Sequence, residues 1–377
     1  MYDCKLSVII VPHGDGLPPE LCLCSLRAAA GGMDAEIFFA HDGLADGRDA
    51  ALRARFPEIT FPDRPRGMNG VRFVNRLIAQ CRGEYILLLH PDTLVGEDCL
   101  RTLCFFMDEH AAEAGAAGVK MIDGRGVFLP ESRRVFPSPR TLFHTPRGRA
   151  GVFADAGRGA VGDMPDRPHR VDAVSDAFVL FSHSALNKTG LLDESLPPEG
   201  AYLDIMYRMS AAGYGRFCIP GERILHCGDR QRVRAFYDAL LLFCKKYYPE
   251  AKTAALLIRL RRRLAILFAK EKERPKTGKR RVLAFCRERH LPEMEAAAGK
   301  HLSGVSGVGL WNIDRMRLSD AVADRRVKMQ AYTDMAFCYP DIPFGRILLF
   351  MDRMPEKNIA CHIYLSENRQ FISCETA

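Results

Sequence analysis

The sequence has no apolar run long enough to cross a membrane. A transmembrane helix needs about 20 consecutive, mostly apolar residues, whereas apolar runs such as Leu6–Val11 have the length of strands. The 13 cysteines contain no repeated Cys-x-x-Cys pair, which excludes a zinc-finger framework, and we interpret them as small buried residues in a reducing compartment. Since the chain enters a strand within its first residues, we expect no signal peptide and a cytoplasmic protein.

The positive charge of the chain is concentrated in one segment. The formal net charge is +8, and part of this excess lies between Arg259 and Arg281. The stretch 254–268 places leucines on one side and arginines among or opposite them, which predicts a basic amphipathic helix. Two interpretations stay open: residues 254–281 lie peripherally on an anionic inner-membrane surface, or the leucines pack on the protein. Nucleic acid is disfavoured, because nearby aromatic residues are not spaced as a stacking platform.

Short β-branched runs alternate with helical stretches over the first two-thirds of the chain. We expect strands at 6–11, 36–40, 59–61, 85–89, 119–121, 126–129 and 179–181, and helices at 19–29, 69–80, 100–110 and 203–212. This alternation predicts a mostly parallel sheet with helices on both faces. Ligands in such sheets bind outside the carboxyl ends of the strands, which here carry His13, His41, Asp42, His90 and Asp92.

A charged, proline-containing linker divides the chain. We predict a nucleotide-binding domain at 1–230, a helical basic connection at 231–278 and a small α/β domain at 279–377. The small domain lacks a Gly-x-Gly-x-x-Gly motif after its first strand, so its backbone cannot closely approach a pyrophosphate. We therefore predict a degenerate Rossmann-like module for interaction or assembly, through which the protein forms homo- or hetero-oligomers.

Short motifs follow one another in a fixed order through the first two-thirds of the chain. They are Gly70-x-x-x-x-Asn75, Gly83–Thr93, Gly118–Gly124, Pro130–Pro139, Val174–Phe178, Gly190–Glu194, Ala212–Tyr214, Ile224–His226 and Phe236–Tyr247. Together they resemble the family 2 glycosyltransferases, which have the GT-A fold, and among these the rhamnosyltransferase-like enzymes of bacterial surface polysaccharides. Each motif is weak alone, but their shared order and spacing argue against chance.

The resemblance implies a nucleotide-diphosphate sugar as the donor. Asp92 matches the metal-binding acid of the family, and His226 matches a late histidine that completes the metal or diphosphate site. The implied cofactor is divalent, Mn²⁺ or Mg²⁺, and Mn²⁺ tolerates an imidazole better. The structural alternative is that Asp92 only forms the turn that follows a strand. The positions implied for binding the nucleotide sugar are Pro12, His41, Asp42, Arg72, Asn75, His90 and Asp92.

The position of the general base departs from the family pattern. Ala201 and Tyr202 replace the usual acid pair, and neither is a carboxylate. We consider Asp204, expected at the start of a helix, and Asp176, where the family has a glycine, as catalytic residues; Glu199 also lies nearby. Alternatively, Asp204 complements a helix dipole and Asp176 is a solvated loop residue.

Two hypotheses about function follow from these residues. The first is an inverting, metal-assisted glycosyltransferase that acts on a lipid-linked or glycan acceptor of a surface polysaccharide, at the cytoplasmic face of the membrane. The second is a catalytically inactive glycosyltransferase-like protein that serves as a binding or scaffolding subunit. The Ala201-Tyr202 pair and His41 support the second hypothesis, whereas Asp92 and His226 argue for the first.

Overall fold

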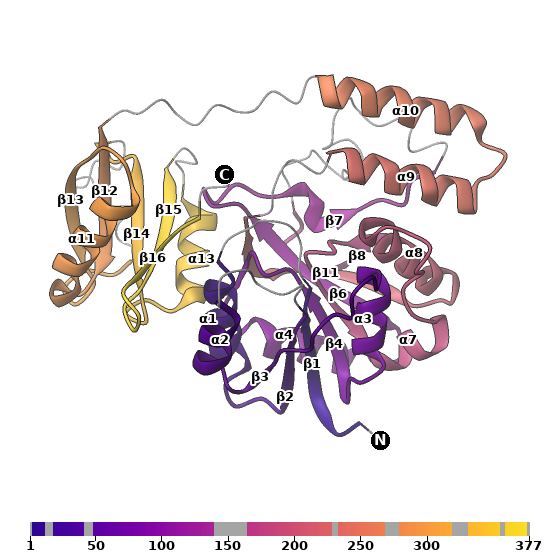
Figure 1. Ribbon diagram of the computed structural model, residues 1–377, viewed down its shortest axis with the longest axis horizontal. Helices are drawn as coiled ribbons and strands as arrows, with labels where there is room; N and C mark the ends of the chain where they lie inside the picture. The colour runs from indigo at the N-terminus through magenta and orange to yellow at the C-terminus, as the bar shows by residue number, and fades with distance from the viewer. Residues whose placement is uncertain are drawn as a thin grey trace.

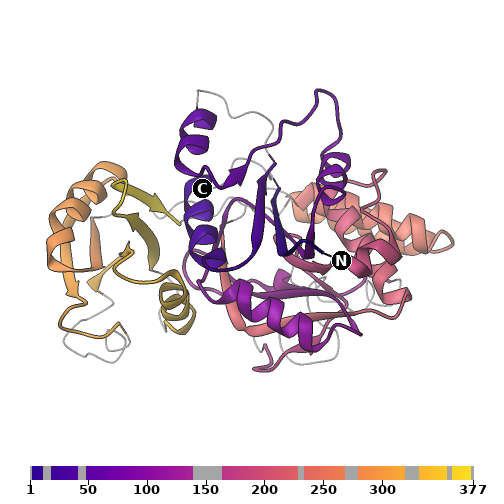
Figure 2. The same cartoon turned by 90° about the horizontal axis from the view of Figure 1, so that it is seen from below.

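The structure, a computed structural model, contains two main β-sheets with helices on both faces of each (Figure 1). The second sheet and the helical pair α9–α10 lie at opposite ends of the molecule, with the first sheet between them (Figure 2). The structure describes residues 2–11, 18–40, 48–138, 164–227, 233–267, 279–318, 331–354 and 359–374.

The first sheet is mixed and mostly parallel. Its strand order is β3-β2-β1-β4-β10-β6-β11-β5, with β8 paired to β11. Strands β3, β2, β1 and β4 are parallel, β10 is antiparallel to both β4 and β6, and β11 is parallel to β6. The strands are β1 (Cys4–Ile10), β2 (Ala35–Phe39), β3 (Ile59–Thr60), β4 (Gly83–Leu89), β5 (Thr93–Val95), β6 (Ala114–Ile122), β8 (His169–Arg170), β10 (Phe178–Ser182) and β11 (Gly215–His226).

Helices bury both faces of the first sheet. Leu87 and Leu89 of β4 belong to the core that includes α1, α2 and α4, whereas Ile86 and Leu88 belong to the core that includes α3, α7 and α8. The sequence of β4 is almost continuously apolar for this reason, since a strand buried on both faces does not alternate. The helices are α1 (Pro19–Ala30), α2 (Arg48–Arg55), α3 (Gly70–Ile78), α4 (Cys99–Glu109), α7 (His183–Thr189) and α8 (Pro198–Ala211). The short elements η2 (Pro130–Ser132), β7 (Arg133–Arg134) and β9 (Ala173–Val174) lie before and after residues 139–163.

The second sheet has the strand order β13-β12-β14-β15-β16. The first four strands in this order are parallel and β16 is antiparallel to β15. Helix α11 packs on one face with the core of Val282, Ala284 and Cys338, and α13 packs on the other. The elements are β12 (Arg280–Cys286), η4 (Glu288–His290), α11 (Leu291–His301), β13 (Val305–Asn312), β14 (Asp334–Tyr339), α13 (Phe344–Arg353), β15 (Ala360–Leu365) and β16 (Gln370–Ser373).

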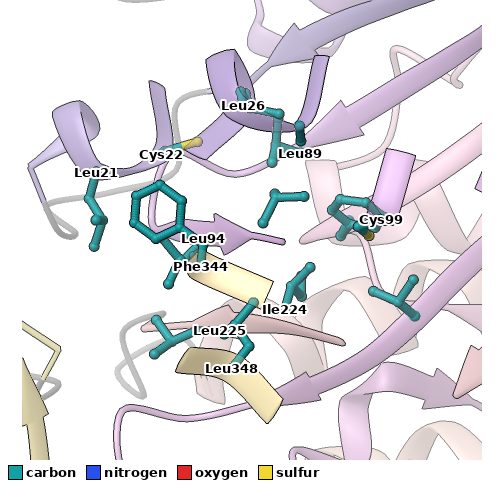
Figure 3. Close-up of a cluster of buried hydrophobic side chains, with 14 of the residues drawn as sticks. Leu21, Cys22, Leu26, Leu89, Leu94, Cys99, Ile224, Leu225, Phe344 and Leu348 are labelled. Atoms are coloured by element: carbon teal, nitrogen blue, oxygen red, sulfur yellow. The ribbon is translucent and has the colours of Figure 1, made fainter. Parts of the chain in front are cut away.

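One hydrophobic core joins the two sheets. Phe344 and Leu348 of α13 lie against Leu94 of β5 and Leu225 of β11 (Figure 3). Helix α13 therefore covers the first sheet at β5, which follows Asp92, and at β11, which precedes Cys227. Because these side chains are buried completely, the second sheet is packed on the first as part of one core.

Polar contacts fix the same interface. Both carboxylate oxygens of Glu97 accept bonds from the first backbone amides of α13, Phe344 N at 2.7 Å and Gly345 N at 2.8 Å. These amides have no partner within the helix, so Glu97 acts as its cap and complements its dipole. At the other end of α13, Asp352 pairs with Lys120 at 2.6 Å and with Arg223 at 3.2 Å.

Two helices follow the first sheet. Helix α9 (Val233–Tyr247) packs on α8, and α10 (Lys252–Leu267) packs on α9. Within the described residues, no helix is both long and apolar enough to cross a membrane.

The predicted fold class is confirmed, with a mixed, mostly parallel sheet followed by a small α/β unit. Helix α8 begins at Pro198 and not at the expected residue 203, because Pro198 occupies its favourable first position despite the following Gly200. Asp204 therefore lies in the second turn of the helix. The strand expected at 126–129 is reduced to an isolated bridge between Ile122 and Phe128.

Candidate functional site

The connection between β4 and β5 places two potential ligands at the carboxyl edge of the first sheet. His90 is 3 % exposed and Asp92 is 2 % exposed. The hydroxyl of Thr93 donates to the His90 carbonyl at 2.7 Å and closes the turn, while His90 N donates to Ala177 O at 3.0 Å. The turn chemistry expected of this segment is therefore present, and it holds the Asp92 carboxylate inside the protein.

Strand β11 brings His226 to the same place from far along the chain. His226 pairs in register with Thr93, and Cys227 N donates to the Asp92 carbonyl at 3.0 Å. His226 Nε2 and Asp92 Oδ1 are 3.5 Å apart, and the His90 and His226 ring centroids are 5.8 Å apart. The structure thus assembles three of the residues that the sequence nominated.

The Asp92–His226 pair has the features of a cation site. Potential ligand atoms of His90, Asp92 and His226 lie within 4.8 Å of one another. Asp92 Oδ1 and His226 Nε2 are both buried and form no hydrogen bond. A buried carboxylate oxygen without a hydrogen bond is costly, and a divalent cation between it and the imidazole would satisfy both atoms. One carboxylate and imidazole donors suit Mn²⁺ or a similar borderline ion better than Mg²⁺.

A buried thiol lines the back of this turn. Cys22 of α1 lies 3.8 Å from the His90 carbonyl and 3.7 Å from Thr93 Oγ1. Burial raises the pKa of Cys22 to about 12, so the thiol is neutral next to Asp92. Because it contacts the turn and carries no charge, we assign Cys22 to packing.

Asp176 lies in the segment that reaches the end of β4. It is 4 % exposed and forms an ion pair with Arg134 of β7. The contact between His90 N and Ala177 O places the neighbouring backbone beside the His90–Asp92 turn. Sequence reasoning missed Arg134, although it falls within the quoted motif Pro130–Pro139. The pairing of β7 with β9 brings Arg134 close to the Asp176 segment, and the ion pair shows the contact.

Ala201 and Tyr202, which the resemblance places where an acid pair is expected, are buried in α8. Ala201 is 0 % and Tyr202 is 3 % exposed. The Tyr202 hydroxyl is buried without a hydrogen-bond partner. Burial, followed by the negative charge of Asp176 and of Glu199, raises the pKa of Tyr202 above its usual range, so its hydroxyl is neutral at physiological pH.

Asp204 is at the centre of a buried ion network. It is 0 % exposed. Oδ2 accepts from Arg208 Nε at 2.8 Å, and Oδ1 accepts from Lys246 Nζ at 2.5 Å and Tyr247 OH at 2.6 Å. Arg208 also donates to the carbonyls of Thr189 and Leu191. The network ties α8 to α9 and to the end of α7.

The predicted rim residues of the donor pocket contact the loop before α8. The side-chain amide of Asn75 donates to Leu192 O at 2.8 Å and its oxygen accepts from Leu192 N at 3.0 Å. Arg72 Nε lies 3.8 Å from Glu194 Oε2, and both side chains are substantially exposed. Three further predicted residues, Pro12, His41 and Asp42, lie outside the described residues. Their expected contacts with the nucleotide stay predictions.

One comparison with known protein families matches part of this chain. The family model described as glycosyl transferase family 2 matches residues 7–159. No curated protein matches the chain.

Solved structures similar to this chain include a mannosyltransferase from Pyrobaculum calidifontis in complex with GDP-Man and Mn²⁺. It has 14 % identity and a TM-score of 0.42, over 72 % of this chain and 77 % of that one. Another is TarS from S. aureus, with 14 % identity and a TM-score of 0.43, over 71 % of this chain and 44 % of that one.

Proposed function

We propose that this chain, in which residues 7–159 belong to glycosyl transferase family 2, is an inverting, metal-assisted glycosyltransferase. The observation that carries the proposal is the pair of buried atoms Asp92 Oδ1 and His226 Nε2, 3.5 Å apart at the carboxyl edge of the sheet. When bound there, Mn²⁺ or Mg²⁺ would act as a Lewis acid on the departing diphosphate of the sugar donor. Asp92 and His226 would hold the ion, and His90 would line the site.

Inversion requires one displacement at the anomeric carbon. The acceptor oxygen forms its bond to that carbon as the bond to the diphosphate oxygen breaks, and a base takes the acceptor proton. We propose Asp176 as this base, since its segment lies against His90 and its partner Arg134 is a side chain that an acceptor could displace. Asp204, the other candidate, has both carboxylate oxygens occupied by Arg208, Lys246 and Tyr247.

The exposed side of α10 supports a contact with an anionic membrane. Leu256 and Leu260 are 65 % and 52 % exposed, and Arg259 and Arg263 are exposed on the same side of the helix. Two leucines flanked by cations fit a surface of anionic lipid headgroups. We therefore propose that the acceptor is lipid-linked, belongs to a surface polysaccharide, and is reached at the inner face of the membrane.

Vesicle binding tests this part of the proposal. The wild-type chain should sediment with vesicles of phosphatidylglycerol and phosphatidylcholine but not with phosphatidylcholine alone. Leu256→Ser with Leu260→Ser should abolish binding, whereas Phe105→Ser, which removes a 62 % exposed apolar side chain of α4, should leave it unchanged. Equal binding by the leucine variant would refute a role for α10.

The second sheet is proposed as an assembly module. We divide the chain into domains at 1–230, 231–278 and 279–377, and the second sheet lies in the last of these. Its strand β13 lies at the edge of the sheet, and Ser306 and Gly307 of this strand are exposed. Edge strands offer unpaired backbone groups to another chain. Sedimentation of the full chain tests this, because a monomer at micromolar concentration would contradict it.

A catalytically inactive binding subunit is the second candidate function. It is favoured by the replacement of the acid pair with Ala201 and Tyr202, both buried in α8. Incubating the protein with UDP- and GDP-sugars and Mn²⁺ distinguishes the two functions. Release of the nucleotide diphosphate, lost in Asp92→Asn and in Asp176→Asn, supports transfer. Mn²⁺-dependent binding without any release supports the inactive subunit.

A further inference from the structure

The carboxyl edge of the second sheet contains a second group of metal-binding side chains. The chain passes from β12 to β13 on one side and then to β14 on the other, so the strand order reverses at β12. Such reversals open a crevice at the carboxyl ends of the strands, where α/β sheets bind ligands. His290 follows β12, Cys338 is the second-to-last residue of β14, and Asp341 follows that strand. These three residues meet at the reversal.

The three side chains are close and largely buried. His290 Nδ1 lies 2.6 Å from Asp341 Oδ2 and 3.5 Å from Cys338 Sγ. The side chains of His290 and Asp341 are 17 % and 2 % exposed, and Cys338 is 0 % exposed. Their possible ligand atoms all lie within 4.8 Å of one another. Among the described parts of the chain, this is the one such group besides His90, Asp92 and His226.

The geometry argues against two other uses of these groups. A thiol–imidazole–carboxylate relay needs contacts on both ring nitrogens, with the base bonded to the thiol through one and to the acid through the other. Here both contacts fall on Nδ1 of His290. An anion is also disfavoured, because the Asp341 carboxylate is buried at the centre of the group. A cation remains.

We propose that His290, Cys338 and Asp341 bind Zn²⁺, with a water molecule as the fourth ligand at the exposed side of His290. Thiolate, imidazole and carboxylate are the donors that Zn²⁺ takes in proteins. With tetrahedral bonds of usual length, the sulfur and nitrogen ligands of Zn²⁺ are about 3.5 Å apart, which matches Cys338 and His290. The His290–Asp341 distance has to open by several tenths of an ångström, which a small rotation of the imidazole provides.

Binding releases two protons from the ligand atoms. One is the thiol proton of Cys338, and the other is the Nδ1 proton that His290 donates to Asp341, which moves to solvent or, in the neutral ring, to Nε2. Burial raises the pKa of Cys338 above its usual range, and the negative charge of Asp341 raises it further. The thiol is therefore neutral before the ion arrives, and its proton passes to solvent as the Zn–S bond forms. Burial alone would also raise the pKa of Asp341, but the Arg287 amide and His290 lower it, so this ligand is already ionised.

The ion would join two separate elements of the sheet. His290 belongs to the 3₁₀ turn that opens α11, and Cys338 and Asp341 belong to the connection from β14 to α13. Arg287 and Arg289 lie 3.6 and 4.0 Å from Asp341 Oδ1, and both side chains are largely exposed, so they can turn outward as the cation takes their place. The site is independent of the proposed transfer reaction.

Cobalt substitution in the full-length protein tests the proposal. Co²⁺ bound to a thiolate gives a charge-transfer absorption in the near ultraviolet, which the proposed ligands of the other site, Asp92 and His226, cannot produce because neither contains sulfur. After chelator treatment, we expect one equivalent of Co²⁺ to give this band and Zn²⁺ to remove it. The band should persist in His226→Gln, so that failure of the first site and of this one are distinguishable.

Variants assign the ligands. Cys338→Ala should lose the band, and His290→Gln and Asp341→Asn should weaken Co²⁺ binding about tenfold or more. Cys361→Ala, which removes another fully buried thiol of the same sheet, is the matched control and should keep it. Circular dichroism checks that each variant is folded. No thiolate band in the wild type, or a band that survives in folded Cys338→Ala, would overturn the proposal.

Discussion

Asp204 provides a sharp test of which carboxylate is structural. The substitution Asp204→Asn keeps the shape of the side chain but removes a fully buried charge that faces Arg208 and Lys246. An amide can still accept bonds through its oxygen, but its NH₂ group has to face a donor, and two cations lose their partner. Removing one member of a buried pair costs about 3–5 kcal/mol.

The two cations are not fully buried, which reduces this cost. The side chains of Arg208 and Lys246 are 28 % and 35 % exposed, so water can solvate part of each charge. Arg208 keeps its bonds to the Thr189 and Leu191 carbonyls, and Lys246 keeps Asp193. We therefore expect a loss of about 2–3 kcal/mol, at or just below the lower limit of that range. In a domain of this size it corresponds to a fall in melting temperature of about 4–12 °C.

Differential scanning fluorimetry measures the loss, and transfer assays below the melting temperature measure turnover per folded molecule. Asp204→Asn should be destabilised but keep turnover, whereas Asp176→Asn should lose turnover. An Asp204→Asn protein that melts like the wild type would refute the structural role. A fully folded variant without turnover would make Asp204 the base.

Three further predictions concern the interface of the sheets and the ion network. Glu97→Ala removes the cap of α13 and should cost about 1–2 kcal/mol, seen as faster hydrogen exchange in the first turn of α13; unchanged exchange would contradict the capping role. Gly124→Ala should lower the melting temperature, because a Cβ there would overlap the Cys374 carbonyl, whereas Gly221→Ala meets no atom within 4 Å and should be neutral. Lys246 lowers the pKa of Asp193 to about 2, so this carboxylate contributes stability above about pH 4 that is lost as the pH falls towards 2. Acid titration of Asp193→Asn should show a smaller loss over that interval, and an unchanged profile would count against the pair.

The sequence predicted most of the first sheet because its strands are buried on both faces and so appear as short apolar runs. The family resemblance implied that Asp92 and His226 share one site, and the structure brings them together where β4 and β11 end at the same edge. The roles of Asp176 and Asp204 could not be separated, because the partners Arg134 and Lys246 lie 42 positions away in each case. Such contacts depend on tertiary packing that local patterns do not encode.

The packing of the second sheet against the first could not be predicted from the sequence either. Its strands follow from apolar runs, but Glu97 and α13 are 247 positions apart at their contact, and nothing in either segment indicates the other. The group of His290, Cys338 and Asp341 could not be predicted from the sequence for a similar reason. Its spacing fits no zinc-finger pattern, and it forms only because the strand order reverses at β12.

The proposed function depends on Asp92 and His226 holding a divalent cation that binds a nucleotide diphosphate. Isothermal titration of UDP and GDP, with and without Mn²⁺, tests it most directly in the wild type and in Asp92→Asn. We expect at least one of these nucleotides to bind only with Mn²⁺, and to bind at least about tenfold more weakly to Asp92→Asn. Binding that is equally tight without Mn²⁺, or unchanged in Asp92→Asn, would contradict it.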